Sequence, residues 1–110
     1  MYMLGWSPGT FDAEHPIRFL MATPNAEKRL GSWNFGAYSN PRVDALLPQI
    51  QVELDDAKRQ RMIDEVHAIL RDEAVYVPLH VQPLVWGSKD SVRLTQRADN
   101  FFLLRWVTIQ

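Results

Sequence analysis

The chain has 110 residues, of which 46% are apolar and 23% charged, and its formal net charge is −1. This length predicts a single domain, residues 1–110, with one modest core, and the composition is ordinary for a globular protein. The near-neutral charge excludes the basic footprint of a nucleic-acid-binding protein. The absence of cysteine excludes disulfides, cysteine-based zinc sites and thiol catalysis.

The sequence shows no targeting or membrane-spanning pattern. No stretch approaches the roughly 20 apolar residues of a transmembrane helix. The first six residues, Met1–Trp6, lack the basic start and long apolar core of a signal peptide. If the intact protein is exported, we expect its signal to lie upstream of Met1.

The first 40 residues predict a strand, a short helix and a long loop. Residues 2–6 form an apolar run, which ends in the turn cluster 7–10. A short helix is expected to begin at Asp12 or just after it, with Ile17, Leu20 and Met21 on one face. Residues 25–40 are polar and carry three bulky aromatic side chains, which is typical of a loop that packs down or contacts a ligand. These aromatics are Trp33, Phe35 and Tyr38.

A helix with a strong start signal is predicted from residue 41. Asn40 can cap it with its side-chain oxygen, and Pro41 at the first helical position gives up a donor that has no partner there. Pro48 is expected to kink or end this helix. Its buried face is predicted to consist of Val43, Leu46, Leu47 and Ile50.

A second helix is predicted over residues 56–72, with Asp55 as its cap. Asp55 and Arg59 are expected to pair across one turn. The helix is expected to pack against the strand that follows it. Its predicted buried face consists of Met62, Ile63, Val66, Ile69 and Leu70.

After residue 74 the apolar period changes from that of a helix to that of a strand. Residues 75–82 alternate, residues 84–86 resume the pattern after Pro83, and residues 92–94 and 101–109 predict two further strands. Pro78 limits the first strand to an edge or a bulge. The predicted fold class is mixed α and β, with central helices packed on short strands.

The sequence carries no pattern typical of catalysis or metal binding. His15, His67 and His80 share no metal-ligand spacing. His67 is most simply interpreted as a helix-flank residue, and for His80 packing is favoured over coordination. The helix carboxylates are interpreted as caps and a solvated face rather than an acid–base pair. No nucleophile elbow, P-loop or dinucleotide fingerprint is present. We therefore expect no enzyme, no catalytic residue, no metal and no cofactor.

Aromatic residues make recognition the better hypothesis, because rigid rings line small-molecule clefts. Many of them lie in or beside predicted loops. For Trp86 a core role is favoured. For Trp6, at a strand end, and Trp33, in the long loop, core and ligand contact are equally compatible with the sequence.

Several loose motifs occur in an order that resembles a known family. They are Gly5-Trp6, Tyr38 to Leu46, Asp55 to Arg59, Val77 to Gln82, Val85 to Gly87 and Arg97 to Asn100. The chain resembles the C-terminal part of the solute-binding proteins of the extracellular family 5 type, which serve peptide, nickel and opine ABC importers. Those proteins are several times longer than this chain.

The resemblance implies a fragment of a two-lobed, clamshell receptor that closes on a solute and delivers it to a membrane permease. This chain would form part of the second lobe, in a periplasmic or extracytoplasmic protein. Trp6, Asp12, Trp33 and Asn34 are expected to face the cleft between the lobes, partly exposed and converging on one concavity. As an isolated chain it is expected to bind weakly or not at all, and to form a homodimer through exposed strand edges.

One position departs from the family pattern. Many peptide-binding members carry an aspartate shortly after Gly-Trp that holds the free amino group of the peptide. Here that position is Gly9 or Thr10, and Asp12 is displaced from it. The departure argues against an ordinary peptide with a free amino group, whereas a nickel chelate, an opine, a sugar or a modified peptide stays open.

Two other classes of function stay open. The first is an independent small interaction or assembly domain, which a ribosome-binding site directly before Met1 would favour. The second is an enzyme, which would require turnover that depends on one carboxylate.

Overall fold

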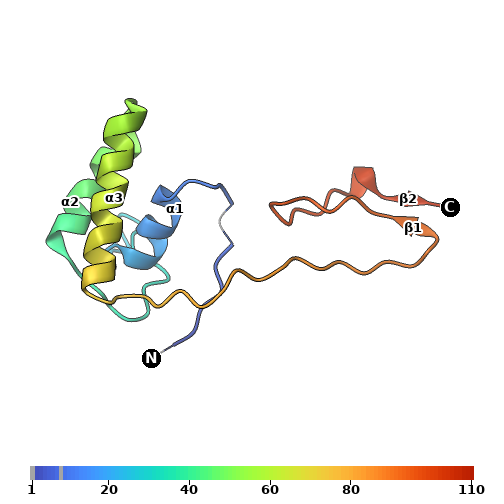
Figure 1. Ribbon diagram of the computed structural model, residues 1–110, viewed down its shortest axis with the longest axis horizontal. Coiled ribbons are helices and arrows are strands. Elements are labelled where there is room, and N and C mark those ends of the chain that lie inside the picture. The colour runs from blue at the N-terminus through green and yellow to red at the C-terminus, as the bar shows by residue number, and fades with distance from the viewer. Residues whose placement is uncertain (1, 8) are drawn as a thin grey trace. The chain divides into compact units, whose positions relative to one another are not determined.

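The computed structural model describes residues 2–7 and 9–110 (Figure 1). Contacts group them in two compact units, Met1–Val77 and Pro78–Gln110, where the sequence predicts one domain. Each unit is described by itself. The predicted turn at residues 7–10 includes Pro8, which lies outside the described residues. None of the helices in the described part of the chain has the length and apolarity that a membrane span needs.

We call the unit Met1–Val77 the helical unit. Its first helical segment lies where the sequence predicts the short helix. α1 (Glu14–Pro16) continues directly into η1 (Ile17–Met21), which has the wider π-helical winding. Ile17 and Leu20 are buried and Met21 is half-buried, so the predicted apolar face is confirmed. Residues 2–6, predicted as a strand, do not form one.

The second helix begins as predicted. In α2 (Pro41–Val52), the Asn40 side chain accepts hydrogen bonds from the backbone N–H groups of Arg42, at 2.9 Å, and Val43, at 3.3 Å. Pro48 does not end the helix, which runs four residues further to Val52. The predicted buried face is confirmed, because the four expected residues are all buried: Val43, Leu46, Leu47 and Ile50.

The third helix, α3 (Asp56–Asp72), has the predicted bounds and the predicted cap. The Asp55 carboxylate accepts a hydrogen bond from the backbone N–H of Lys58 at 2.9 Å. Ile63, Val66 and Leu70 are buried and belong to one core with α2, beside which α3 lies (Figure 1). The prediction that this face packs on a following strand is wrong, because that strand does not form.

The second unit contains little regular structure. β1 (Val92–Arg93) and β2 (Thr108–Ile109) pair antiparallel, with Val92 opposite Ile109. The short 3₁₀ helix η2 (Leu104–Trp106) precedes β2, so the predicted strand 101–109 is shortened to its last residues. The predicted strands at 75–82 and 84–86 are wrong. Residues 76–88 form no backbone–backbone hydrogen bond with any described residue. Pro78 and Pro83 also lack the N–H donor that a β-ladder needs.

The described elements mix helices with a two-stranded sheet, and the long helices pack on each other rather than on short strands. The assignment of these elements to the second lobe of a two-lobed receptor stays a prediction.

Candidate functional site

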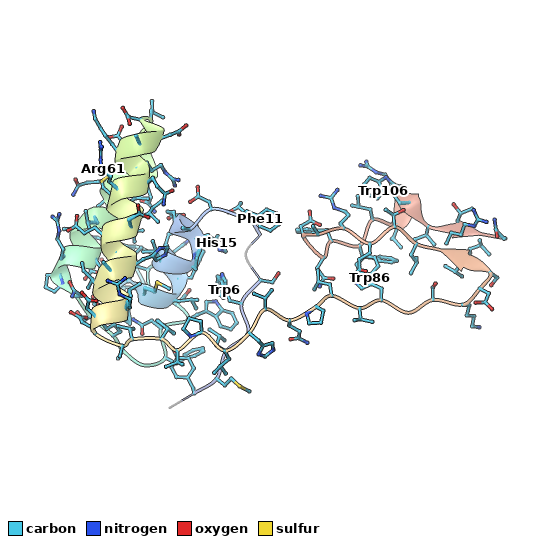
Figure 2. All side chains as sticks on the ribbon, in the orientation of Figure 1. Trp6, Phe11, His15, Arg61, Trp86 and Trp106 are labelled. Atoms are coloured by element: carbon cyan, nitrogen blue, oxygen red, sulfur yellow. The ribbon has the colours of Figure 1, made fainter. Side chains whose placement is uncertain are left out.

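Six rings of the helical unit contact one another in a continuous group, which we call the aromatic cluster: Tyr2, Trp6, His15, Phe19, Trp33 and Phe35. The Trp6 and Trp33 indoles meet edge to face, with centroids 6.2 Å apart and planes at 71°. Trp6 also contacts His15, at 5.5 Å between centroids (Figure 2). Edge-to-face geometry is the favoured arrangement for aromatic pairs.

Local backbone contacts place the loop of Trp33 against η1. The backbone N–H of Gly31 donates to the carbonyl of Arg18 at 2.9 Å, and that of Trp33 donates to the carbonyl of Phe19 at 3.0 Å. Gly31 has a φ of +60°, and a Cβ at this position would come within 2.4 Å of the Ala22 carbonyl oxygen. Only glycine fits this close approach.

The most exposed rings of the aromatic cluster lie on the loop, and Tyr2 is 40% exposed as well. Trp33 is 47% exposed and Phe35 is 65% exposed, whereas Trp6 is half-buried. The guanidinium of Arg18 lies 4.4 Å from the centroid of the Phe19 ring and also pairs with Glu14, at 3.1 Å. Flat apolar faces beside a guanidinium can hold the apolar and planar parts of a small polar solute.

Two nitrogen atoms inside the aromatic cluster have no partner among the described residues. They are Nε1 of Trp6 and Nδ1 of His15, and both are shielded from solvent. A buried donor or acceptor without a partner carries a desolvation cost. The polar groups in this part of the cluster therefore have fewer hydrogen bonds than those of an ordinary core.

Asn34 is buried, 5% exposed, where the sequence led us to expect partial exposure. Its Nδ2 donates to the carbonyls of Ala22, at 3.0 Å, and Tyr38, at 2.8 Å. Its Oδ1 accepts the backbone N–H of Tyr38 at 3.0 Å. Because both ends of the amide are used, Asn34 closes the loop rather than presenting a free polar group to a solute.

The Asp12 side chain is 41% exposed, and both of its carboxylate oxygens accept hydrogen bonds. Its two carboxylate oxygens accept hydrogen bonds from Nη2 of Arg59, at 3.0 and 2.9 Å, and Oδ1 also accepts the backbone N–H of Glu14 at 2.9 Å. The Arg59 hydrogen bond, followed by that from Glu14, lowers the pKa of Asp12 below its ordinary value of 3.8. The predicted pairing of Arg59 with Asp55 is wrong, because the Arg59 side chain reaches back to Asp12 instead.

The sequence analysis missed three members of this arrangement. His15 and Phe19 lie four residues apart, which places them on one face of a helix, and that spacing could have linked them to the site. Arg59 gave no local signal, because its partner Asp12 is 47 positions away in the sequence.

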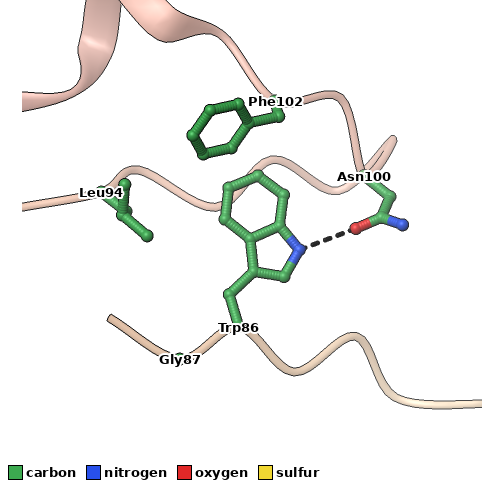
Figure 3. A pocket seen from close by; sticks show the side chains of 5 residues that line it. All are labelled: Trp86, Gly87, Leu94, Asn100 and Phe102. Carbon is green, nitrogen blue, oxygen red and sulfur yellow. Dashed lines mark hydrogen bonds between the residues drawn. The ribbon is translucent and has the colours of Figure 1, made fainter. Parts of the chain in front are cut away.

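The second unit carries a separate hollow of about 390 Å³, lined by Trp86, Gly87, Leu94, Asn100 and Phe102. Figure 3 shows the Trp86 indole N–H donating to the Asn100 side-chain oxygen, a hydrogen bond of 2.8 Å. The Trp86 and Phe102 rings lie 5.5 Å apart between centroids. Trp86 is half-buried in this shallow hollow rather than in a closed core.

Glutathione-binding proteins named GsiB are similar in sequence to this chain. Those of Escherichia coli K12 and Shigella flexneri are each 33% identical to it over 85 residues, and that of Shigella dysenteriae serotype 1 is 32% identical. The match covers 77% of this chain and 16% of each relative, so the chain spans about a sixth of the length of these proteins. No protein-family model and no solved structure matches the chain.

Proposed function

We propose that this chain is part of the extracytoplasmic solute-binding component of an ABC importer, and that its aromatic cluster contacts a small peptide-like solute. The observation that carries the proposal is the exposure of Trp33 and Phe35 at the edge of a continuous group of rings. The similarity to glutathione-binding proteins supports a binding role rather than an enzymatic one.

The state of Asp12 bears on the class of solute. An ordinary peptide has a free α-ammonium group, which a protein usually pairs with a carboxylate. Both oxygens of Asp12 already accept hydrogen bonds from Arg59, so we propose that Asp12 is not the carboxylate that pairs with such an ammonium group. Glutathione, the ligand in the name of the relatives, is a peptide whose γ-linkage leaves an α-ammonium group free. We propose a modified peptide of this kind, with its ammonium group paired to a carboxylate other than Asp12.

The proposed working unit is larger than this chain. In a clamshell receptor the solute is enclosed between two lobes, and enclosure supplies much of the affinity. We propose that this chain supplies part of the second lobe and that a permease is the partner of the whole protein. One wall alone should therefore bind solute weakly.

The reading frame upstream of Met1 tests the assignment to a longer protein. We expect an in-frame extension that encodes a signal peptide and a first lobe. A ribosome-binding site directly before Met1, with no related sequence upstream, would favour the stand-alone interaction domain instead.

Calorimetry with glutathione tests the binding role in the longer protein. Trp33→Ala should weaken binding at least tenfold, because the removed ring has an exposed face in the aromatic cluster. Trp106→Ala is the matched control, since Trp106 is also part-exposed, at 40%, but belongs to the second unit. An equal loss of affinity for glutathione in the two variants would contradict the proposal that the solute contacts the aromatic cluster.

A further inference from the structure

One guanidinium joins three segments of the helical unit. Arg59 stands in the first turn of α3, and its Nε donates to the carbonyl of Ile50, in the last turn of α2, at 2.9 Å. The same guanidinium donates to both oxygens of Asp12. Carbonyls in the last turn of a helix lack a helical partner, so Arg59 satisfies one of them while it binds the carboxylate.

Asp12 connects this guanidinium to the aromatic cluster. It stands two residues before α1, and its carboxylate accepts the backbone N–H of Glu14 at 2.9 Å. Its carbonyl accepts the backbone N–H of His15 at 3.3 Å. α1 and η1 carry His15 and Phe19, and both rings contact Trp6. The two rings that contact Trp6 therefore stand on a helical segment whose N-terminal side is held by Arg59 through Asp12.

We propose that the Asp12–Arg59 pair is a positioning device that holds the Trp6 indole in its edge-to-face contact with Trp33. The effect of this pair on solute binding rests on the proposed function. Its effect on the arrangement of the Trp6 and Trp33 rings can be tested without any solute. Neither Asp12 nor Arg59 belongs to the aromatic cluster, so both act through the residues that they hold.

The shape of the arginine side chain is essential to this role. A guanidinium presents several donors in a fixed planar fork, whereas an ammonium is a single point charge on a flexible stem. Lysine at position 59 cannot reproduce the contacts to both Ile50 and Asp12 in the same geometry. Arg59→Lys therefore keeps the charge and removes the fork.

The chain offers a matched control. The Arg42 guanidinium donates to both Glu65 oxygens, at 2.5 and 2.9 Å, and joins α2 to α3. This pair is more exposed, at 55% and 41% of the two side chains. Arg42→Lys thus removes a comparable fork, which binds Glu65 and not Asp12.

Circular dichroism of the 110-residue chain tests the inference. The Trp6–Trp33 pair should give an exciton couplet, which Trp33→Phe identifies by abolishing it. We expect Arg59→Lys and Asp12→Asn to lose most of this couplet while the helix signal is retained. Arg42→Lys should leave the couplet unchanged.

Two results would overturn the inference. The first is a couplet of parental amplitude in both Arg59→Lys and Asp12→Asn. The second is loss of the helix signal in Asp12→Asn, since the pair would then hold the fold and not the rings. In a glutathione titration of the proposed longer protein, both variants should weaken binding several-fold. If no glutathione binds to any variant while the couplet behaves as expected, the proposed function fails and the positioning role stands.

Discussion

Asn34 shows how a single buried amide fixes the loop that carries the exposed rings. Its side chain makes three hydrogen bonds, one to Ala22 at the end of η1 and two to Tyr38, which lies four residues after Asn34 in the loop. The loop is also attached at its far side, because Tyr38 Oη donates to the Glu73 carboxylate at 2.6 Å and Asn40 Nδ2 donates to it at 2.8 Å. Burial, followed by this hydrogen bond to Glu73, raises the pKa of Tyr38 to about 12.

Asn34→Ala should therefore destabilise the helical unit. The substitution leaves the buried partners of the amide without a hydrogen bond, at an expected cost of about 2 kcal/mol in the free energy of unfolding. Asn25→Ala is the control, because the Asn25 side chain accepts only one exposed hydrogen bond, from the backbone N–H of Lys28. Urea unfolding followed by circular dichroism measures both, and equal losses would contradict the role of Asn34.

The Asp12 carboxyl gives a pH dependence with a defined sign. Its pKa is lowered in the folded chain, so the stabilisation by Arg59 is fully present above the unfolded value of about 3.8 and is lost as the pH falls through the lower folded value. A carbon-detected NMR titration of the carboxyl should show a midpoint below 3.8. Arg59→Gln should move the midpoint upward, and a parental midpoint at or above 3.8 would refute the pairing.

At the scale of elements, the two long helices form one core through facing apolar side chains. Val66 of α3 is completely buried, as are Val43 and Ile50 of α2. Val43 and Ile50 lie seven residues apart on one face of α2, so α2 and α3 stabilise each other by burying their apolar faces in one core.

Val66→Asp should unfold the helical unit, because it places an unpaired charge in this core and a small domain has only roughly 5–15 kcal/mol of stability. His67→Asp puts the same side chain on the exposed neighbouring position and should change stability by about 0.5 kcal/mol. Thermal unfolding followed by circular dichroism separates them. A Val66→Asp chain that melts within a few degrees of His67→Asp would disprove the buried face.

The sequence predicted the elements whose signals are local. Asn40 and Asp55 are side chains that cap the helix directly after them, and the apolar period of 3.6 then marks the buried face. The alternation at residues 75–86 has the strand period, but a strand needs a partner, and residues 76–88 have no backbone partner among the described residues. The Asp12–Arg59 pair was likewise not predictable, because it depends on how distant elements pack.

At the scale of the whole molecule, the exposed apolar side chains of residues 78–110 need an explanation. They include Leu79, Val81, Val85, Phe101, Leu104 and Ile109. Large apolar patches rarely stay bare on a monomer, and free strand edges invite pairing with another chain. In the proposed longer protein, other segments would cover them, and in the isolated chain a second copy is the simplest cover.

We therefore expect the isolated chain to form a homodimer whose interface includes part of the Val75–Trp86 or Phe101–Ile109 segment. Val81→Lys, at a side chain that is 95% exposed, should shift the equilibrium toward monomer. Val52→Lys is the control at an exposed position, 75%, in the helical unit. Light scattering after gel filtration reports the mass. A parental monomer from micromolar to millimolar concentration would contradict this expectation.

The tryptophan indole N–H signals of the isolated chain offer the most direct test of where a solute binds. The four indoles divide evenly, since Trp6 and Trp33 belong to the helical unit and Trp86 and Trp106 to the second. Under addition of millimolar glutathione, we predict that the Trp6 and Trp33 signals shift progressively, as expected for weak binding to one wall, while the other two stay in place. Shifts confined to Trp86 and Trp106, or no shift in any of the four, would contradict the assignment of the aromatic cluster as the solute-binding surface.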